Sequence, residues 1–296
     1  MLTHKYNLML KSAFVITIGM FLTACSNETH KETVNNDTKT ITEDTTVNTG
    51  IGEITYSLPS PLQIASIFKK SGMEYKAGLT SQLKDPAKYM TSLNKTLNLG
   101  VYSADLSYAL LNKQHQTVME YMKLGRRTAD QLGIGSVYEV NNVSKRFEKN
   151  ITNEDSLAVI LSELQMEMDF YIDENNQQQI TAIAFAGAWV ESMYIAFTIN
   201  ETNKEKPLNG RLSEQMTILE SIINALKTVE KKVPAITELI ASLLDVKNAY
   251  EALPSVKDTR NTTPEADKKI VLTDQEITLL SKKIEPLRLK LINGEF

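Results

Sequence analysis

Apolar residues recur along most of this chain at the three- and four-residue spacing of an amphipathic helix. The clearest stripe places six apolar side chains on one face: Leu157, Ile160, Leu161, Leu164, Met168 and Ile172. Further stripes occupy residues 212–226, 236–250 and 277–291, and another runs through residues 106–124. Because this spacing buries one side of each helix, the pattern predicts a single all-α domain of roughly seven to ten helices.

Helix N-termini are marked at four places by residues that satisfy free backbone N–H groups. Two are N-caps followed by proline at the first helical position, and two resemble capping boxes. The four sites are Ser60-Pro61, Asp85-Pro86, Thr152 with Asp155, and Thr273 with Glu276.

Glycine and proline residues indicate where helices end. We expect Gly125 to end the stripe at 106–124 and Pro254 to close the helix before it. Residues 257–268 are polar and are predicted to form a loop. Pro286 lies inside the apolar pattern of the last helix and is predicted to kink or split it, because proline lacks the backbone N–H.

Only two short tracts resemble strands, Ile54-Thr55-Tyr56 and Ile270-Val271-Leu272. We expect them to pair with each other, which allows at most one short two-stranded β pairing. The segment Ala182–Ile199 is apolar on nearly every side and is predicted to be the central, buried helix. Glu191 inside it, and its flanks rich in Gln and Asn, argue against a membrane span.

The N-terminus has the layout of a secretory signal. A basic start with Lys5 and Lys11 precedes an apolar run from Ala13 to Leu22, which is too short for a stable membrane helix. Leu22-Thr23-Ala24-Cys25 follows and contains the only cysteine. This motif resembles the bacterial lipobox. Two alternatives stay open: an ordinary signal peptide with a chance cysteine, and an uncleaved membrane helix.

The resemblance implies that residues 1–24 are a lipoprotein signal peptide and that Cys25 carries the lipid anchor. Two or three acyl chains would give lasting attachment, since each buried methylene contributes roughly 0.8 kcal/mol. Residues 25–50 are rich in Thr, Asn and Glu and are predicted to form a disordered polar tether. The globular domain is then expected at 51–296.

Two segments extend the resemblance: SLPSPLQIASIFKKSG at 57–72 and LNLGVYSADLSYA at 97–109. Behind a lipobox and a polar tether, they are similar to uncharacterised helical lipoproteins of Bacteroidota. That group carries no known activity, so no functional residue transfers. Ser26 follows the cysteine where enterobacterial inner-membrane lipoproteins have aspartate. The resemblance therefore implies a lipid-anchored location in the cell envelope, at the outer membrane, with the face left open.

Charge and cysteine content narrow the choice of partners. The formal charge is −4 for the whole chain and becomes −6 when Lys5 and Lys11 leave with the signal. A negative chain without a basic patch excludes nucleic acid as an expected partner. With Cys25 lipidated, no disulfide is available, and the domain must be stabilised by its apolar core alone.

Catalytic motifs are scarce. Histidine occurs in the predicted domain only at His115, in a polar stretch typical of a surface residue. The chain has no GxGxxG, P-loop, HExxH or EF-hand sequence, so no cofactor is expected. Glu163 and Glu167 stand one helical turn apart and could ligate a metal, but a solvated acidic face is the favoured interpretation and no metal site is predicted.

Glu191 and Asp105 are the unusual carboxylates, because nearly all their sequence neighbours are apolar. A buried carboxylate must find a hydrogen-bond donor or keep its proton. Arg126, Arg127 and Arg146 are the candidate partners. We favour a buried structural network over a functional site. Tyr102, Tyr108 and Tyr194 are likewise expected in the core, rather than as a set that stacks on a ligand.

These sequence features are compatible with three functions. The favoured one is a membrane-anchored, non-enzymatic binding module for an unknown protein or small ligand. The alternatives are a hydrolase that uses Glu191 and Asp105, and a ligand-delivery lipoprotein that serves a transporter. A deep cleft containing both carboxylates would favour an enzyme or a ligand-binding protein, whereas a closed core with both groups paired would favour a scaffold or interaction role.

Overall fold

The computed structural model describes residues 46–51, 54–203, 206, 208–262 and 269–296. The predicted signal peptide, Cys25 and most of the expected tether therefore lie outside the described residues. Within the described ranges the chain forms ten α-helices and one β-hairpin, which confirms the all-α prediction.

The described helices are α1 (Pro61–Lys70), α2 (Ser92–Leu111), α3 (His115–Gln131), α4 (Val143–Lys149), α5 (Glu154–Glu174), α6 (Gln178–Thr202), α7 (Asn209–Val229), α8 (Ile236–Glu251), α9 (Pro254–Thr262) and α10 (Asp274–Asn293). The hairpin consists of β1 (Thr46–Ile51) and β2 (Ile54–Pro59).

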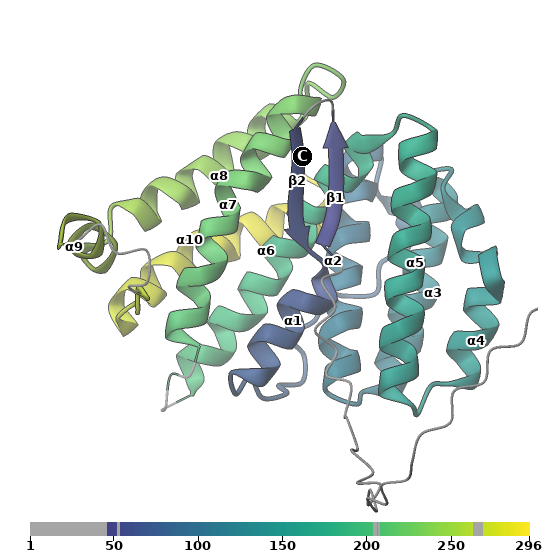
Figure 1. The fold of residues 1–296 in the computed structure, drawn as a ribbon, viewed down its shortest axis with the longest axis horizontal. Helices are drawn as coiled ribbons and strands as arrows, with labels where there is room; N and C mark the ends of the chain where they lie inside the picture. The colour runs from purple at the N-terminus through teal and green to yellow at the C-terminus, as the bar shows by residue number, and fades with distance from the viewer. Residues whose placement is uncertain (1–45, 52–53, 204–205, 207, 263–268) are drawn as a thin grey trace, which may run out of the picture. The chain divides into compact units, whose positions relative to one another are not determined.

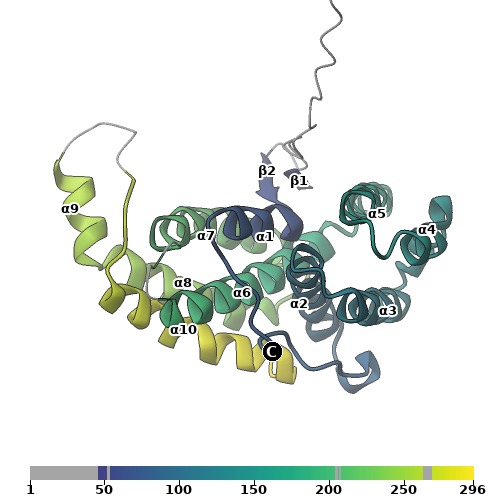
Figure 2. The same ribbon diagram turned by 90° about the horizontal axis from the view of Figure 1, so that it is seen from below.

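Helices α2 and α6 pack against each other at the centre of the domain (Figure 2). Helices α3, α4 and α5 lie on one side of this pair, and α7, α8 and α10 lie on the other (Figure 1). Two apolar clusters fill the two sides. The larger surrounds Trp189 of α6, and the smaller surrounds Tyr121 of α3.

Glycine allows α2 and α6 to approach closely. A Cβ atom added to Gly100 of α2 would lie closer than 3.0 Å to the backbone of Ala184 and Ala188. One added to Gly187 of α6 would likewise clash with the carbonyl of Leu97. The two helices thus touch backbone to backbone, and this fixes the relative positions of the polar groups that they carry.

The hairpin corrects two predictions. β2 pairs antiparallel with β1, Thr46 opposite Pro59 and Ile51 opposite Ile54, whereas residues 270–272 form no strand. The tether boundary expected at residue 50 is therefore too late, since Thr46–Gly50 belong to β1. The polar character of this segment predicted a tether, but four of its six residues are β-branched (Thr46, Val47, Thr49 and Ile51), which favours a strand when a partner lies next in the chain.

Several helix ends match the capping signals. Ser60 and Thr273 form complete capping boxes at the starts of α1 and α10. At α5 the N-cap is Asn153, one residue after the predicted Thr152. Asp85 caps only a short 3₁₀ helix, at Pro86–Lys88.

Other helix ends were predicted wrongly. The stripe at 106–124 belongs to two helices, which separate where Lys113 adopts a positive φ of 59°. Gly125 lies inside α3 instead of ending it. Pro254 closes α8 but also opens α9, so part of the expected loop at 257–268 is helical. Proline suits the first turn of a helix as well as the end of the previous one.

Pro286 neither splits nor ends α10, which runs through it to Asn293. Its side chain faces solvent, where water can satisfy the carbonyl group that loses its helical partner. Helix α6 is the one described helix long and apolar enough to cross a bilayer, but 89% of its most apolar window is buried inside the fold. This burial confirms the predicted central core helix.

Candidate functional site

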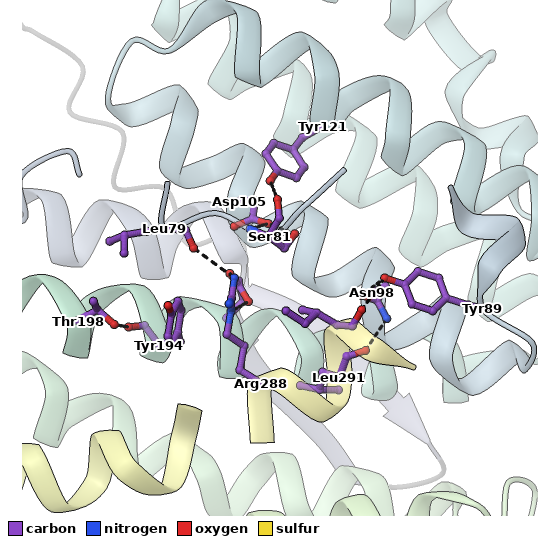
Figure 3. Close-up of polar contacts among 12 residues, drawn as sticks. Leu79, Ser81, Tyr89, Asn98, Asp105, Tyr121, Tyr194, Thr198, Arg288 and Leu291 are labelled. Atoms are coloured by element: carbon purple, nitrogen blue, oxygen red, sulfur yellow. Dashed lines mark hydrogen bonds and ion pairs between the residues drawn. The ribbon is translucent and has the colours of Figure 1, made fainter. Parts of the chain in front are cut away.

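The Glu191 carboxylate is sealed in the core and paired with an arginine. Nε and Nη2 of Arg288 each donate to one carboxylate oxygen of Glu191 at 2.8 Å. Glu191 is 0% exposed and Arg288 only 7%. The guanidinium carbon of Arg288 also lies 4.0 Å from the ring centroid of Tyr194, where the ring face attracts the positive charge (Figure 3).

The predicted partners of the buried carboxylates were wrong. Arg126, Arg127 and Arg146 bind Glu139, Asp85 and Glu163 near the surface. The sequence did not identify Arg288 as the partner of Glu191, because the two residues are 97 positions apart and Arg288 lies in a helix with an ordinary amphipathic pattern. Only the packing of α10 against α6 brings the two side chains together.

Asp105 of α2 forms the second part of this network. Its Oδ2 atom accepts hydrogen bonds from the backbone N–H of Ser81 at 3.0 Å and from the Ser81 hydroxyl at 2.5 Å. Tyr121 of α3 donates to the carbonyl of the same serine (Figure 3). Asp105 is 0% exposed. The loop that holds Ser81 is thus fixed from both α2 and α3.

Burial disfavours the ionised form of both carboxyl groups. Burial raises the pKa of Asp105 well above its ordinary value, and the nearby Glu191 charge adds to the rise. Burial also raises the pKa of Glu191, but the hydrogen bonds from Arg288 oppose that effect. We therefore assign the negative charge to Glu191, which has the arginine.

A row of polar side chains on α2 continues from this network toward the end of α10. The Tyr89 hydroxyl donates to Oδ1 of Asn98 at 2.9 Å, and Asn98 donates to the carbonyl of Leu291 at 2.9 Å (Figure 3). One turn earlier, Asn94 donates to the carbonyls of Gly294 and Phe296. These groups hold the end of α10 against α2, which is a structural role.

A cavity lined by buried and partly exposed side chains lies elsewhere, between α1, α2, α3 and α5. It has a volume of about 70 Å³. A water molecule needs roughly 10–15 Å³ on the same scale, so this space equals about five to seven water molecules. None of its lining side chains is charged. The polar ones are Ser60, Ser103, Ser107, Ser162 and Gln165, with the hydroxyl-bearing rings of Tyr102, Tyr121 and Tyr138.

A second cavity, of about 40 Å³, adjoins the first along α5. The two cavities share Pro61, Gln165 and Met168 in their walls, and we call them together the α5 cavities. The second is bounded by α1, α2, α5 and α6, and Asp169 is its only charged lining residue. Nothing in the sequence pattern marked this region, because its residues come from four separate helices.

The remaining sequence candidates do not come together. His115 is the first residue of α3, and Glu163 forms an ion pair with Arg146. Among the described residues no group of three or more His, Cys, Asp or Glu side chains is placed to hold a metal ion. The three candidate tyrosines are also apart: Tyr108 stacks on Tyr75, Tyr102 lies beside Tyr121, and Tyr194 lies under Arg288.

Comparison of the chain with known protein families, with curated proteins and with solved structures finds no match.

Proposed function

We propose that this chain is a lipid-anchored protein of the cell envelope whose helical domain binds a ligand without catalysing a reaction. The closed state of the carboxylate network argues against catalysis, and the α5 cavities carry the binding role. Glu191 and Asp105 are both 0% exposed, and the strongest hydrogen-bond donors around them are already engaged. A substrate could reach them only if the core opened, which disfavours the hydrolase alternative.

The α5 cavities support a binding role. Ser162, Gln165 and Met168 on their α5 wall are partly exposed, so a small molecule can approach from solvent. The first cavity offers hydroxyl and amide groups among apolar side chains, a combination typical of sites that bind small neutral groups. It carries no carboxylate, histidine or cysteine that could serve as base or nucleophile.

The evidence for a lipid anchor on Cys25 comes from the amino-acid sequence. Leu22-Thr23-Ala24-Cys25 follows a basic and apolar start, and the resemblance to a lipobox supports lipidation of Cys25. An anchored domain with a ligand cavity also suits delivery to a transporter, which stays a prediction.

Filling the first cavity tests the proposal. Ser162 lines it, and its hydroxyl donates only to the carbonyl of Ala158 in its own helix. Replacing it with phenylalanine should occupy the cavity. Phenol is a suitable probe because its ring and hydroxyl match the cavity lining. We expect phenol to shift the amide resonances of Ser103 and Ser107 saturably in the parent protein and not in Ser162→Phe.

Thr217→Phe is the matched control. Thr217 lies on the exposed face of α7, and its hydroxyl also donates to a carbonyl of its own helix, that of Glu214. This variant should bind phenol like the parent. An absence of saturable shifts in the parent, or equal shifts in Ser162→Phe, would rule out the α5 cavities as a binding site.

A further inference from the structure

Asp169 is a carboxylate without a cation in an apolar wall. It lies on α5 and lines the second cavity among Leu99, Ile172, Ile180 and Phe185. Its Oδ1 atom accepts a hydrogen bond from Gln165 at 3.0 Å. Among the described residues no lysine, arginine or histidine forms an ion pair with it. The structure therefore places at this cavity a carboxyl group that has an amide donor and no cation.

The residues around Asp169 provide no positive charge to balance its carboxylate. The residues that α1, α2 and α6 contribute to the cavity are all uncharged. On its own helix the neighbouring charge is Asp173, also negative, and the last turn of α5 contains no basic residue. A half-buried carboxylate is costly in such a place unless a cation or a proton joins it. The cavity thus lacks the group that would complement it.

We propose that the second cavity binds the ammonium group of a small alkylamine, with Asp169 as counterion and the apolar chain of the ligand in the α5 cavities. This inference rests on the proposed binding function and names its ligand class. Charge complementarity selects a cation, and the apolar walls select a hydrocarbon chain over a hydrated metal ion. The uncharged first cavity, which shares three wall residues with the second, leaves room for that chain.

The raised pKa of Asp169 is consistent with a site for an ammonium group. Burial raises its pKa to about 7, the hydrogen bond from Gln165 opposes this rise, and repulsion from Asp173 adds to it. A bound ammonium would favour the ionised form and lower this pKa again. Binding of the amine at about pH 6 should consequently release a proton, whereas binding of a neutral alcohol should not.

Hexylamine and hexan-1-ol form the test pair, since they differ only in the head group. Primary amines of this kind stay protonated at about pH 8, as lysine does with its pKa of roughly 10.4. We expect hexylamine to bind the parent at least about tenfold more tightly than hexan-1-ol, as measured by calorimetry. Asp169→Asn should remove this preference and leave the affinity for hexan-1-ol unchanged.

Asp173→Asn is the control for net charge. Asp173 is exposed, accepts a hydrogen bond from Gln178 and does not line the cavity, so this variant should keep the preference for the amine. If Asp169→Asn and Asp173→Asn weaken hexylamine equally, the amine responds to surface charge and the inference is wrong. If hexan-1-ol binds the parent as tightly as hexylamine, the inference fails while the binding function stands. If neither compound binds, the inference is wrong, and the phenol titration decides separately whether the binding function stands.

Discussion

Glu191 and Arg288 are 97 residues apart in the chain and meet in the core, where two hydrogen bonds of 2.8 Å join them. The pair links the central helix α6 to α10. Burial raises the pKa of the neighbouring Asp105 well above its ordinary value, so Arg288 is the cation that balances the Glu191 carboxylate. Several testable consequences depend on this balance.

Glu191→Gln should destabilise the domain. The substitution keeps the side-chain shape but leaves the Arg288 guanidinium buried without its counterion. Breaking one side of a buried ion pair costs roughly 3–5 kcal/mol of unfolding free energy, which urea denaturation at neutral pH can measure. A gain in stability would contradict the structural role of Glu191 and return the search for activity to α6.

A double substitution tests whether the loss comes from the stranded charge. Glu191→Gln combined with Arg288→Met removes both charges and keeps an apolar side chain in place of the arginine. We expect the double variant to be more stable than Glu191→Gln alone, because no unpaired charge remains in the core. Additive losses in the double-mutant cycle would show that the two side chains are not coupled.

Asp105→Asn should stabilise the domain in a pH-dependent way. Burial raises the pKa of Asp105 in the folded protein well above that of the unfolded chain, so this residue weakens folding progressively as pH rises above about 4 toward its raised native pKa. Asparagine has no proton to release and can still accept the hydrogen bonds from Ser81. The stability difference between the two proteins should therefore grow between about pH 4 and pH 7.

Asp85→Asn is the control, because its effect on stability should depend on pH in the opposite direction. The backbone N–H of Ala87, together with Arg127, holds the pKa of Asp85 below its ordinary value. Its contribution is present above the unfolded pKa and is lost as pH falls. This variant should accordingly become relatively less stable as pH rises. A difference for Asp105→Asn that stays constant with pH would show that Asp105 ionises alike in the folded and unfolded states.

Gly187→Ala should weaken the contact between α2 and α6. The added Cβ would collide with the carbonyl of Leu97, which is backbone and cannot rotate away. Overpacking of this kind costs roughly 1–3 kcal/mol. Gly210→Ala in α7 is the matched control, since its Cβ would meet only Val271 at 4.0 Å. That variant should be neutral or gain up to about 1 kcal/mol from helix propensity.

Cys25→Ser should abolish membrane attachment or block processing of the precursor, because serine cannot form the thioether. Cell fractionation and labelling with radioactive palmitate measure the outcome. Ser26→Ala should remain attached and labelled. Partitioning of Cys25→Ser into detergent like the parent would exclude the lipid anchor on Cys25.

The sequence predicted those features that depend on neighbouring residues. Helical stripes and the capping boxes at Ser60 and Thr273 are local, because each involves residues within a few positions of one another. The break at Lys113 was missed because a change of backbone direction need not interrupt the apolar period. Pro254 was assigned one role although proline can end one helix and begin the next.

Features that depend on distant pairs were not predictable. Glu191 and Asp105 were recognised as buried carboxylates, because a lone charge among apolar residues is visible in the sequence. Their partners Arg288 and Ser81 became evident only from the packing of α10 and of the loop before α2. The α5 cavities have no sequence signal, since they are the space that five separate helices leave between them.

The late position of Arg288 also affects how the chain is made. At roughly 5–20 residues per second, the ribosome adds the 97 residues between Glu191 and Arg288 in about 5–20 s. During that interval the central helix holds a carboxylate whose cation has not yet been synthesised. A chain cut short before Arg288 lacks the cation that pairs with Glu191, so its core would have to bury an uncompensated carboxylate or supply a proton to it.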